Sequence, residues 1–480
     1  MSRTLGAEVI GIFQISASIL GVFMTIVSSG IPLTVSRLSA EYKATKNYIR
    51  ENKLVTASTL LAFSLAVIIC ILTLIFKDTI TMLSKSSLVT SVLIALLPAL
   101  IGTALNVGFK GSLWGGQKHF ANCLVDFIEA IIKVSLIFIL VTKAKSIEEG
   151  IVLCALSTSI ACLISTIISM LYYFKYKGRF SNPCGEFKLL IKKSLPITLL
   201  RIVSSIAGML ISVIVPLRLI NVGYSSEQAL SLFGIALGMT LPLLYLPNTL
   251  VGSLSTALIP DLAKLKAEKN YYEFESKIKS SITFSVFISL LLIPCFMGIG
   301  KEIGLFVYNN EMSGVMLEYC ALIMLPMGIN NITSSILNSM GLEVKSFIHY
   351  VLGSVFMILG IIFLPKYLGI YSLAVGMGAS LIISGILNLK MIKKEIGATN
   401  IILKSTIKMC IFLIPSVLLT KWSYNCFIKI FTNFFAIGFS CILGVLSYFT
   451  LCLVFRIITL DGLFVNLKQI KILKRKKKSV

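Results

Sequence analysis

Four polar side chains share one face of an otherwise apolar stretch, residues 122–142. They are Asn122, Asp126, Glu129 and Lys133, spaced four, three and four residues apart, and at about 100° per residue they align on one side of a helix. Glu129 and Lys133 have the i,i+4 spacing of a helical ion pair. Such a stripe either joins helices as a self-neutralised seam or lines a cavity with an ion or proton site. In the second interpretation Asp126 and Glu129 carry ion or proton coupling, and Lys133 binds substrate.

An isolated arginine, Arg201, lies about 10 Å inside a second apolar stretch, residues 194–217. Its long side chain either reaches back to the membrane surface or faces a cavity. A guanidinium is a bidentate partner for phosphate oxygens, so the second interpretation makes Arg201 a candidate site for an anionic substrate. Arg37, at the inner end of the first apolar stretch, is either an anchor that fixes topology or a further ligand contact.

Two prolines, Pro242 and Pro247, interrupt the apolar stretch 229–257. Proline removes a backbone hydrogen bond and kinks a helix. The sequence therefore predicts a doubly interrupted helix there, acting either as a hinge or as a fixed bend.

These residues are carried by a chain that is 56% hydrophobic, with a mean hydropathy of +0.94. Soluble domains are about 45–50% apolar, and a membrane-spanning helix needs about 20 mostly apolar residues. We predict an all-α polytopic membrane protein, with no inserted soluble domain. Its expected spans are 11–36, 54–76, 88–110, 122–142, 149–174, 194–217, 229–257, 279–300, 313–338, 346–366, 370–392, 405–421 and 432–456.

Positive charge alternates between the gaps that separate these segments. Most of the 44 Lys and Arg residues fall in every second gap and in the C-terminal tail. Cytoplasmic loops retain Lys and Arg, so these gaps and the C-terminus are expected to be cytoplasmic. The run 474–478 either binds anionic lipids or is an ordinary anchor of the same kind.

Thirteen crossings are an odd number, so a cytoplasmic C-terminus places Met1 outside. Two hypotheses account for this parity. Either a short N-terminal tail is translocated, or the chain lacks a helix that would precede its first span.

A duplication is indicated by two pairs of matching helix exits. Pro32 and Pro260, each following Ile and preceding a Leu beside cations, lie 228 residues apart, and Lys118 and Lys345, each following Gly and preceding Phe, lie 227 apart. An offset of about six helices predicts two six-helix lobes of the same orientation, related by a pseudo-two-fold axis along the membrane normal.

Other classes of function are disfavoured. The formal charge of +24 is spread over short loops rather than one surface, which argues against nucleic acid as a partner. The 11 Cys lie mostly in apolar segments without CxxC spacing, and the two His, His119 and His349, lie near segment edges. We therefore expect no metal, no cofactor, no catalytic residue and no enzymatic activity.

Several stretches resemble a known family. The residues LGAEVIGIFQ (5–14), GIPLTVSRLSAEY (30–42), SLPITLLRIVSSIAGMLISVIVPLRL (194–219) and the continuation 221–263 are similar to the stage V sporulation protein B group. That group is part of the polysaccharide-transport branch of the MATE-like (MOP) exporter superfamily, related to the lipid II flippases.

The resemblance implies fourteen helices with both ends cytoplasmic, of which this sequence lacks the first. It further implies a plasma-membrane flippase for a polyprenyl-diphosphate-linked oligosaccharide or peptidoglycan (spore cortex) precursor. By the same resemblance Arg201 contacts the diphosphate, and Arg218, in the VPLRL element, lies at the external rim of the substrate path. Anionic lipids and envelope-synthesis proteins are the implied partners.

The expected organisation has an N-terminal lobe at 1–185, a C-terminal lobe at 186–398, two further helices at 399–456 and a basic cytoplasmic tail at 457–480. Two alternatives to a flippase stay open. One is a cation-coupled drug antiporter, which requires carboxylates to dominate the cavity. The other is a non-transporting scaffold for envelope or spore assembly, which requires a closed bundle.

Overall fold

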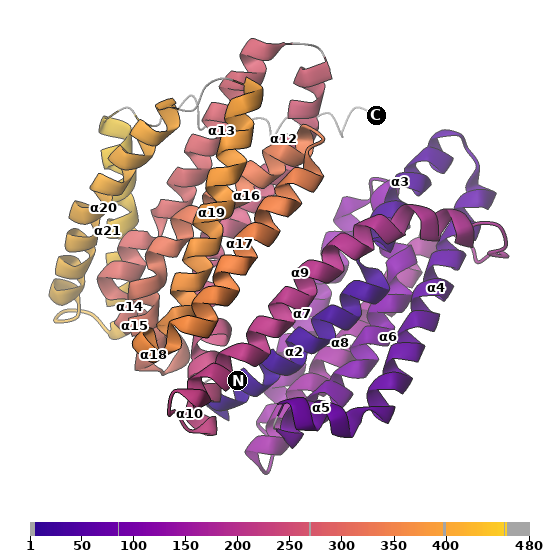
Figure 1. The fold of residues 1–480 in the computed structure, drawn as a ribbon, viewed down its shortest axis with the longest axis horizontal. Helices are drawn as coiled ribbons and strands as arrows, with labels where there is room; N and C mark the ends of the chain where they lie inside the picture. The colour runs from indigo at the N-terminus through magenta and orange to yellow at the C-terminus, as the bar shows by residue number, and fades with distance from the viewer. Residues whose placement is uncertain (1–4, 85, 268–269, 397–399, 456, 458–480) are drawn as a thin grey trace. The chain divides into compact units, whose positions relative to one another are not determined.

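The computed structural model describes residues 5–84, 86–267, 270–396, 400–455 and 457. Its chain divides into two compact units, unit 1 (residues 1–220 and 224–234) and unit 2 (residues 221–223 and 235–480). Every regular element in the described ranges is helical (Figure 1). The predicted tail 457–480 and its basic run lie outside the described residues, except for residue 457.

The described part of unit 1 contains nine helices. They are α2 (Ala7–Ser28), α3 (Ile31–Ala44), α4 (Tyr48–Ile75), α5 (Lys77–Ser84), α6 (Ser87–Gly115), α7 (His119–Val141), α8 (Ile147–Lys175), α9 (Phe187–Asn221) and α10 (Ser226–Gly234). The most buried of these is α6, which packs against α2, α3, α4 and α8. Gly108 permits this packing, because a Cβ there would lie 2.8 Å from the Val55 carbonyl oxygen on α4.

Unit 2 begins with a π-helix, Ile235–Thr240. It continues through α11 (Leu241–Leu244), α12 (Leu246–Ala267), α13 (Tyr271–Leu291), α14 (Ile293–Tyr308), α15 (Glu311–Cys320), α16 (Met324–Ser339), α17 (Glu343–Phe363), α18 (Pro365–Leu368), α19 (Tyr371–Ile396), α20 (Asn400–Phe427) and α21 (Asn433–Val454). The last two helices pack against each other and against α14.

Polar residues at segment edges start several of these helices. The side chains of Asn47, Ser146, Asn270 and Asn310 each accept a hydrogen bond from the backbone N–H three residues later. These bonds satisfy N–H groups that have no partner within the helix. These polar residues therefore help fix where α4, α8, α13 and α15 begin.

Twelve helices among the described residues are long and apolar enough to cross a membrane. Each overlaps one of the thirteen predicted segments. The thirteenth, 122–142, forms α7, which is 23 residues long and carries its three charged side chains within the apolar stretch itself. The prediction of an all-helical, multi-pass membrane protein is confirmed.

The predicted duplication recurs as a pattern of helix packing within each unit. In unit 1 the pairs α3–α6, α4–α6, α6–α8 and α7–α8 are in contact, and in unit 2 the corresponding pairs are α12–α16, α13–α16, α16–α19 and α17–α19. The turn before His119, which opens α7, matches the turn before Glu343, which opens α17. Six-helix repeats account for both matches.

Compact unit 1 extends beyond residue 185, where the sequence places the lobe boundary. Contacts put α9 and α10 in this unit, and the chain leaves it after Gly234. The cause is that α9 packs along α2, as described below. The predicted boundaries at 185/186 and 398/399 separate the repeated lobes. The division into compact units does not test them, so they stay predictions.

A close crossing of two glycines holds α10 against α2. A Cβ on Gly234 would lie 2.6 Å from the Gly11 backbone nitrogen, and a Cβ on Gly11 would lie 3.3 Å from the Gly234 backbone nitrogen. Real side chains do not pack at the shorter of these distances, so only glycine fits Gly234 without moving a helix.

Replacing Gly234 with valine is therefore expected to separate α10 from α2 and to destabilise unit 1 by about 1–3 kcal/mol, the usual cost of overpacking. Thermal unfolding in detergent micelles measures this loss. Gly208→Val is the matched control, because a Cβ on Gly208 meets no atom within 4 Å. Equal melting temperatures for the two variants would contradict the prediction.

Candidate functional site

Helix α9, which carries Arg201, runs antiparallel to α2. Ser212 Oγ lies 2.7 Å from Ser18 Oγ, and Ser205 Oγ lies 2.6 Å from Thr25 Oγ1. Small polar residues let the two helices approach and hydrogen-bond in an apolar medium. Figure 1 shows α9 alongside α2 in unit 1. Arg201 is thereby fixed near the end of α2.

Arg201 contacts the point where α2 gives way to α3. Its Nη1 donates a hydrogen bond of 3.0 Å to the carbonyl oxygen of Ser29, one residue beyond the end of α2. The side chain is otherwise exposed, and a guanidinium has five N–H donors. Four donors are thus available to an anionic group, without any carboxylate of the described chain within ion-pair distance.

Helix α7 has two opposite faces. One is apolar and exposed, as expected of a surface in contact with lipid, and consists of Phe120, Phe127, Ile131, Val134 and Phe138. The predicted polar stripe lies on the other side, since its residues are turned by about 180° from this set at 100° per residue. Asn122 at the start of the stripe is buried, Asp126 is exposed, and Glu129 and Lys133 are half-buried.

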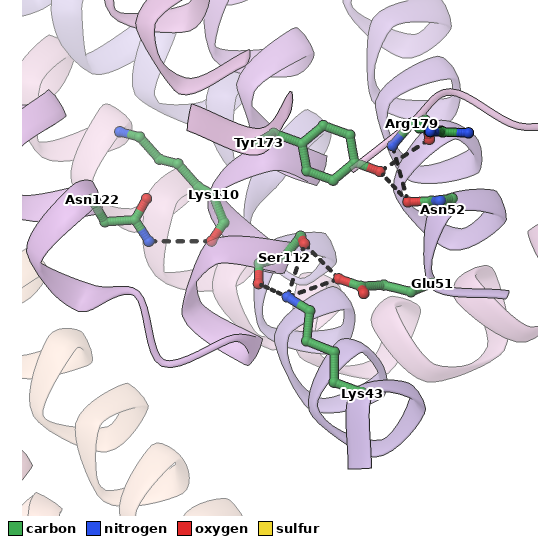
Figure 2. Close-up of polar contacts among 8 residues, drawn as sticks. All are labelled: Lys43, Glu51, Asn52, Lys110, Ser112, Asn122, Tyr173 and Arg179. Atoms are coloured by element: carbon green, nitrogen blue, oxygen red, sulfur yellow. Dashed lines mark hydrogen bonds and ion pairs between the residues drawn. The ribbon is translucent and has the colours of Figure 1, made fainter. Parts of the chain in front are cut away.

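The stripe is paired differently from the sequence-based prediction. Asp126 Oδ1 lies 2.7 Å from Nζ of Lys110, which belongs to α6, and Asn122 Nδ2 donates to the Lys110 carbonyl oxygen at 3.3 Å (Figure 2). Glu129 and Lys133, whose spacing permits an ion pair, form none in the described structure. The reason is that helical spacing permits such a pair but does not impose it on long, flexible side chains.

Lys110 is therefore a member of the site that sequence reasoning missed. It lies at the end of an apolar segment, where a lysine is expected as an anchor, and no local pattern links it to Asp126. Asn122 Oδ1 and Asn106 Oδ1 are buried without a hydrogen-bond partner. Unpaired buried acceptors are unfavourable unless they meet a donor or cation at another stage.

Neutralising Asp126 by Asp126→Asn is expected to change the stability of unit 1 by less than about 1 kcal/mol, because its carboxylate is exposed and such pairs contribute little. If Asp126 carries coupling, ion- or proton-driven transport falls at least about tenfold. Melting temperature and gradient-driven uptake are measured in parallel. Asp78→Asn, the same change at an exposed residue of α5, is the control. Equal transport by both variants would contradict a coupling role.

The four candidate cations do not form one cluster. Arg201 and Arg218 both lie on α9 and are separated by 17 residues, or about 25 Å of helix. Arg37 is exposed on α3, and Lys133 lies on α7. A single diphosphate therefore cannot contact Arg201 and Arg218 at the same time.

The α3–α4 end of unit 1 contains a buried ion pair that was not predicted. Lys43 Nζ lies 2.9 Å from Glu51 Oε1, and Ser112 Oγ donates to the same oxygen at 2.6 Å. Lys43 Nζ also donates to the Ser112 carbonyl oxygen at 2.9 Å (Figure 2). Glu51 is 4% exposed, so the group links α3, α4 and α6. Glu51, one of two glutamates in a basic gap, was the available sequence signal.

A second buried carboxylate secures the connection from α8 to α9. Glu186, 4% exposed, accepts from Arg50 Nε at 2.7 Å and from the Tyr42 hydroxyl at 3.3 Å. Nearby, the Tyr173 hydroxyl donates to Asn52 Oδ1 at 2.8 Å (Figure 2). Lys43 and Arg50 thus have structural roles as partners of buried carboxylates. Arg201 differs from them because its partner is a neutral carbonyl oxygen.

The predicted interruptions of the stretch 229–257 are present. The π-helix Ile235–Thr240 follows α10, and Pro242 opens α11. A break at Tyr245 follows, and Pro247 lies in the first turn of α12. The chain passes between the units at the start of the π-helix. Hinge motion at Pro242 and Pro247 stays a prediction.

The described residues contain no group of three or more His, Cys, Asp or Glu side chains that could hold a metal ion.

Comparison with known proteins decides the family. The family model for polysaccharide biosynthesis proteins matches residues 1–266, more than half of the chain. The chain belongs to the polysaccharide biosynthesis protein family. The matched range includes α2–α10 and hence Arg201, Arg218, Lys110 and Asp126.

The resemblance inferred from the sequence is confirmed for this family member. Stage V sporulation protein B of Bacillus subtilis (strain 168) is 24% identical over 331 residues, which are 66% of this chain and 62% of that protein. The alignment therefore spans less than two thirds of that relative.

Solved transporter structures share the fold. An inward-facing multidrug-resistance MATE family transporter of the MOP superfamily matches with a TM-score of 0.67 at 16% identity, covering 82% of this chain and 94% of the other. The lipid II flippase MurJ, in an inward closed conformation, matches with a TM-score of 0.65 at 16% identity, covering 94% and 96%. The family member thus has the fold of MATE and MurJ transporters.

Proposed function

We propose that this protein flips a polyprenyl-diphosphate-linked oligosaccharide or peptidoglycan precursor to the outer leaflet of the plasma membrane by alternating access. The observation that carries the proposal is membership of the polysaccharide biosynthesis family, since the matched range holds the candidate cations. The likeness of fold to the lipid II flippase MurJ, over 94% of this chain, supports it further.

The cations take different parts in this proposal. Arg201 binds the diphosphate, because its guanidinium is exposed and contacts only a backbone carbonyl among the described residues. Lys133 and Arg37 assist on the inner side. Arg218, about 25 Å further along α9, meets the head group at a later stage near the outer rim.

Asp126 and Glu129 are the proposed coupling residues. Asp126 exchanges its partner Lys110 for an ion or proton, which frees the Lys110 ammonium. Pro242 and Pro247 flank the break at Tyr245, beyond the π-helix at which the chain enters unit 2, and form the proposed hinge.

In this proposal the C-terminus and the basic loops lie in the cytoplasm, as the positive-inside rule predicts. Anionic lipids contact these loops, and envelope-synthesis proteins supply and consume the precursor.

Reconstitution tests the function. The full chain is placed in liposomes with a fluorescent polyprenyl-diphosphate sugar, and a membrane-impermeant quencher reports the leaflet that the sugar occupies. Faster translocation than in empty liposomes is expected. No translocation by well-folded protein would contradict the proposal.

A cation-coupled drug antiporter is the second candidate, favoured by the fold likeness to the multidrug MATE transporter. The same liposomes, loaded with a fluorescent organic cation and given a sodium or proton gradient, separate the two. Cation efflux without sugar translocation would favour the antiporter.

A further inference from the structure

Unit 2 contains a hydrogen-bond network around His349 that joins three helices. His349 Nδ1, on α17, lies 2.8 Å from Oδ1 of Asn388 on α19. Asn388 Nδ2 in turn lies 3.1 Å from Ser334 Oγ and 3.3 Å from Thr333 Oγ1, both on α16. Asn388 is 1% exposed, so these bonds replace water that cannot reach it. We refer to this network as the His349 junction.

The network fixes the orientation of the Asn388 amide. The Thr333 hydroxyl donates to the Ile329 carbonyl oxygen at 2.7 Å, and therefore has only lone pairs to offer Asn388. The amide nitrogen must face Thr333, which turns Oδ1 of Asn388 toward His349. Because an oxygen faces it, Nδ1 of His349 carries a hydrogen in both the neutral and the charged imidazole. The proton is gained or lost at Nε2.

The position of His349 is unusual for a titratable group. It is half-buried and lies six residues into α17, about 9 Å along the helix axis. The neighbouring face of α17 is apolar and exposed, through Ile348, Leu352, Val355, Phe356 and Leu359. Ionisable side chains within such a helix are costly and commonly functional, and histidine changes charge between pH 5 and 8.

The charged side chains on α17 and on the helices packed against it are mostly basic. Helix α17 packs against α16, α18 and α19, and α16 has no titratable side chain. The titratable and charged residues of the other elements are Glu343, Lys345 and Tyr350 on α17, Lys366 and Tyr367 on α18, Tyr371, Lys390, Lys393, Lys394 and Glu395 on α19, and Tyr245 beside Tyr350. No carboxylate therefore lies within one helical turn of His349 along α17.

We propose that His349 is a proton-binding site of unit 2, and that protonation at Nε2 tightens the packing of α17 against α19 and α16. A hydrogen bond from a charged donor is about twice as strong as one between neutral groups. The Nδ1–Asn388 bond strengthens when the imidazole is charged, and Asn388 passes the polarisation to Ser334 and Thr333. This site stands independently of the proposed transport function.

Nuclear magnetic resonance tests proton binding directly, because the chain has only two histidines. In full-length protein labelled at histidine, with His119→Gln to leave one signal, His349 is expected to show the Nδ1–H tautomer at high pH. Asn388→Asp is expected to raise its titration midpoint by at least about one pH unit, since a nearby carboxylate favours the charged imidazole. An Nε2–H tautomer, or an unchanged midpoint, would overturn the proposal.

Hydrogen exchange tests the effect on packing. After correction for intrinsic exchange rates, α17 and α19 are expected to be at least about threefold better protected at pH 5.5 than at pH 8. The difference should vanish in His349→Gln and persist in His119→Gln. If His349→Gln does not fold, the tautomer and midpoint in the other variants still decide the question. The same pH dependence in both histidine variants would overturn the proposed tightening.

Discussion

Glu51→Gln is expected to lower the free energy of unfolding of unit 1 by about 2–3 kcal/mol, the net value of hydrogen bonds to a charged group. Glu51 is 4% exposed and receives both Lys43 Nζ and Ser112 Oγ on one oxygen. The amide is the same size as the carboxylate but has no charge, so Lys43 loses its counter-ion at a site where its side chain is 29% exposed. Differential scanning fluorimetry in micelles measures the change.

The matched control is Glu41→Gln. Glu41 lies on α3 close to Lys43 in sequence, is exposed, and changes the net charge by the same amount. Its melting temperature is expected to stay within error of the wild type. A double variant, Lys43→Met with Glu51→Met, should recover part of the loss, because well-packed apolar groups can replace a buried ion pair. Equal stabilities of Glu51→Gln and Glu41→Gln would show that the ion pair contributes nothing.

The fold could be predicted because its main determinants are local in sequence. The length of each apolar stretch predicts where a span lies, and the alternation of basic gaps predicts the orientation of each span. Even α7, which carries three charged side chains within its span, was found because the rest of that stretch is apolar. The extent of unit 1 could not be predicted, since it depends on α9 packing along α2 through Ser205 and Ser212.

The candidate site was predictable only in part. The polar stripe on α7 follows from helical periodicity, but the partner of Asp126 is Lys110 on another helix. Pairing between helices depends on their rotation and depth, which one sequence does not reveal. The His349 junction was missed for the same reason: its histidine, its asparagine and its two hydroxyl residues come from three helices and share no motif.

The pairing of charges distinguishes structural cations from candidate ligand contacts. Lys43, Arg50 and Lys110 each lie within 2.9 Å of a carboxylate oxygen, so their charge is already balanced within unit 1. Arg201 instead contacts a neutral carbonyl oxygen. Arg201 is therefore better able than these three cations to receive an anionic group.

Arg201→Ala is accordingly expected to reduce translocation of the diphosphate-linked sugar about 10- to 100-fold, which corresponds to the loss of one or two charge-assisted hydrogen bonds. Arg201→Lys should be intermediate, because a lysine keeps the charge but not the bidentate geometry. The quencher assay in liposomes measures both variants.

The substitution Arg201→Gln separates ligand binding from packing. Its amide keeps an uncharged N–H donor on the side of α9 that faces the Ser29 carbonyl oxygen, and the melting temperature reports whether the junction of α2 and α3 is kept while the charge is removed. If Arg201 binds the diphosphate, Arg201→Gln transports as poorly as Arg201→Ala, although its melting temperature equals that of the wild type. If Arg201 only caps the end of α2, Arg201→Gln transports normally. Normal transport by this variant would therefore assign Arg201 to the fold and remove it from the proposed substrate site.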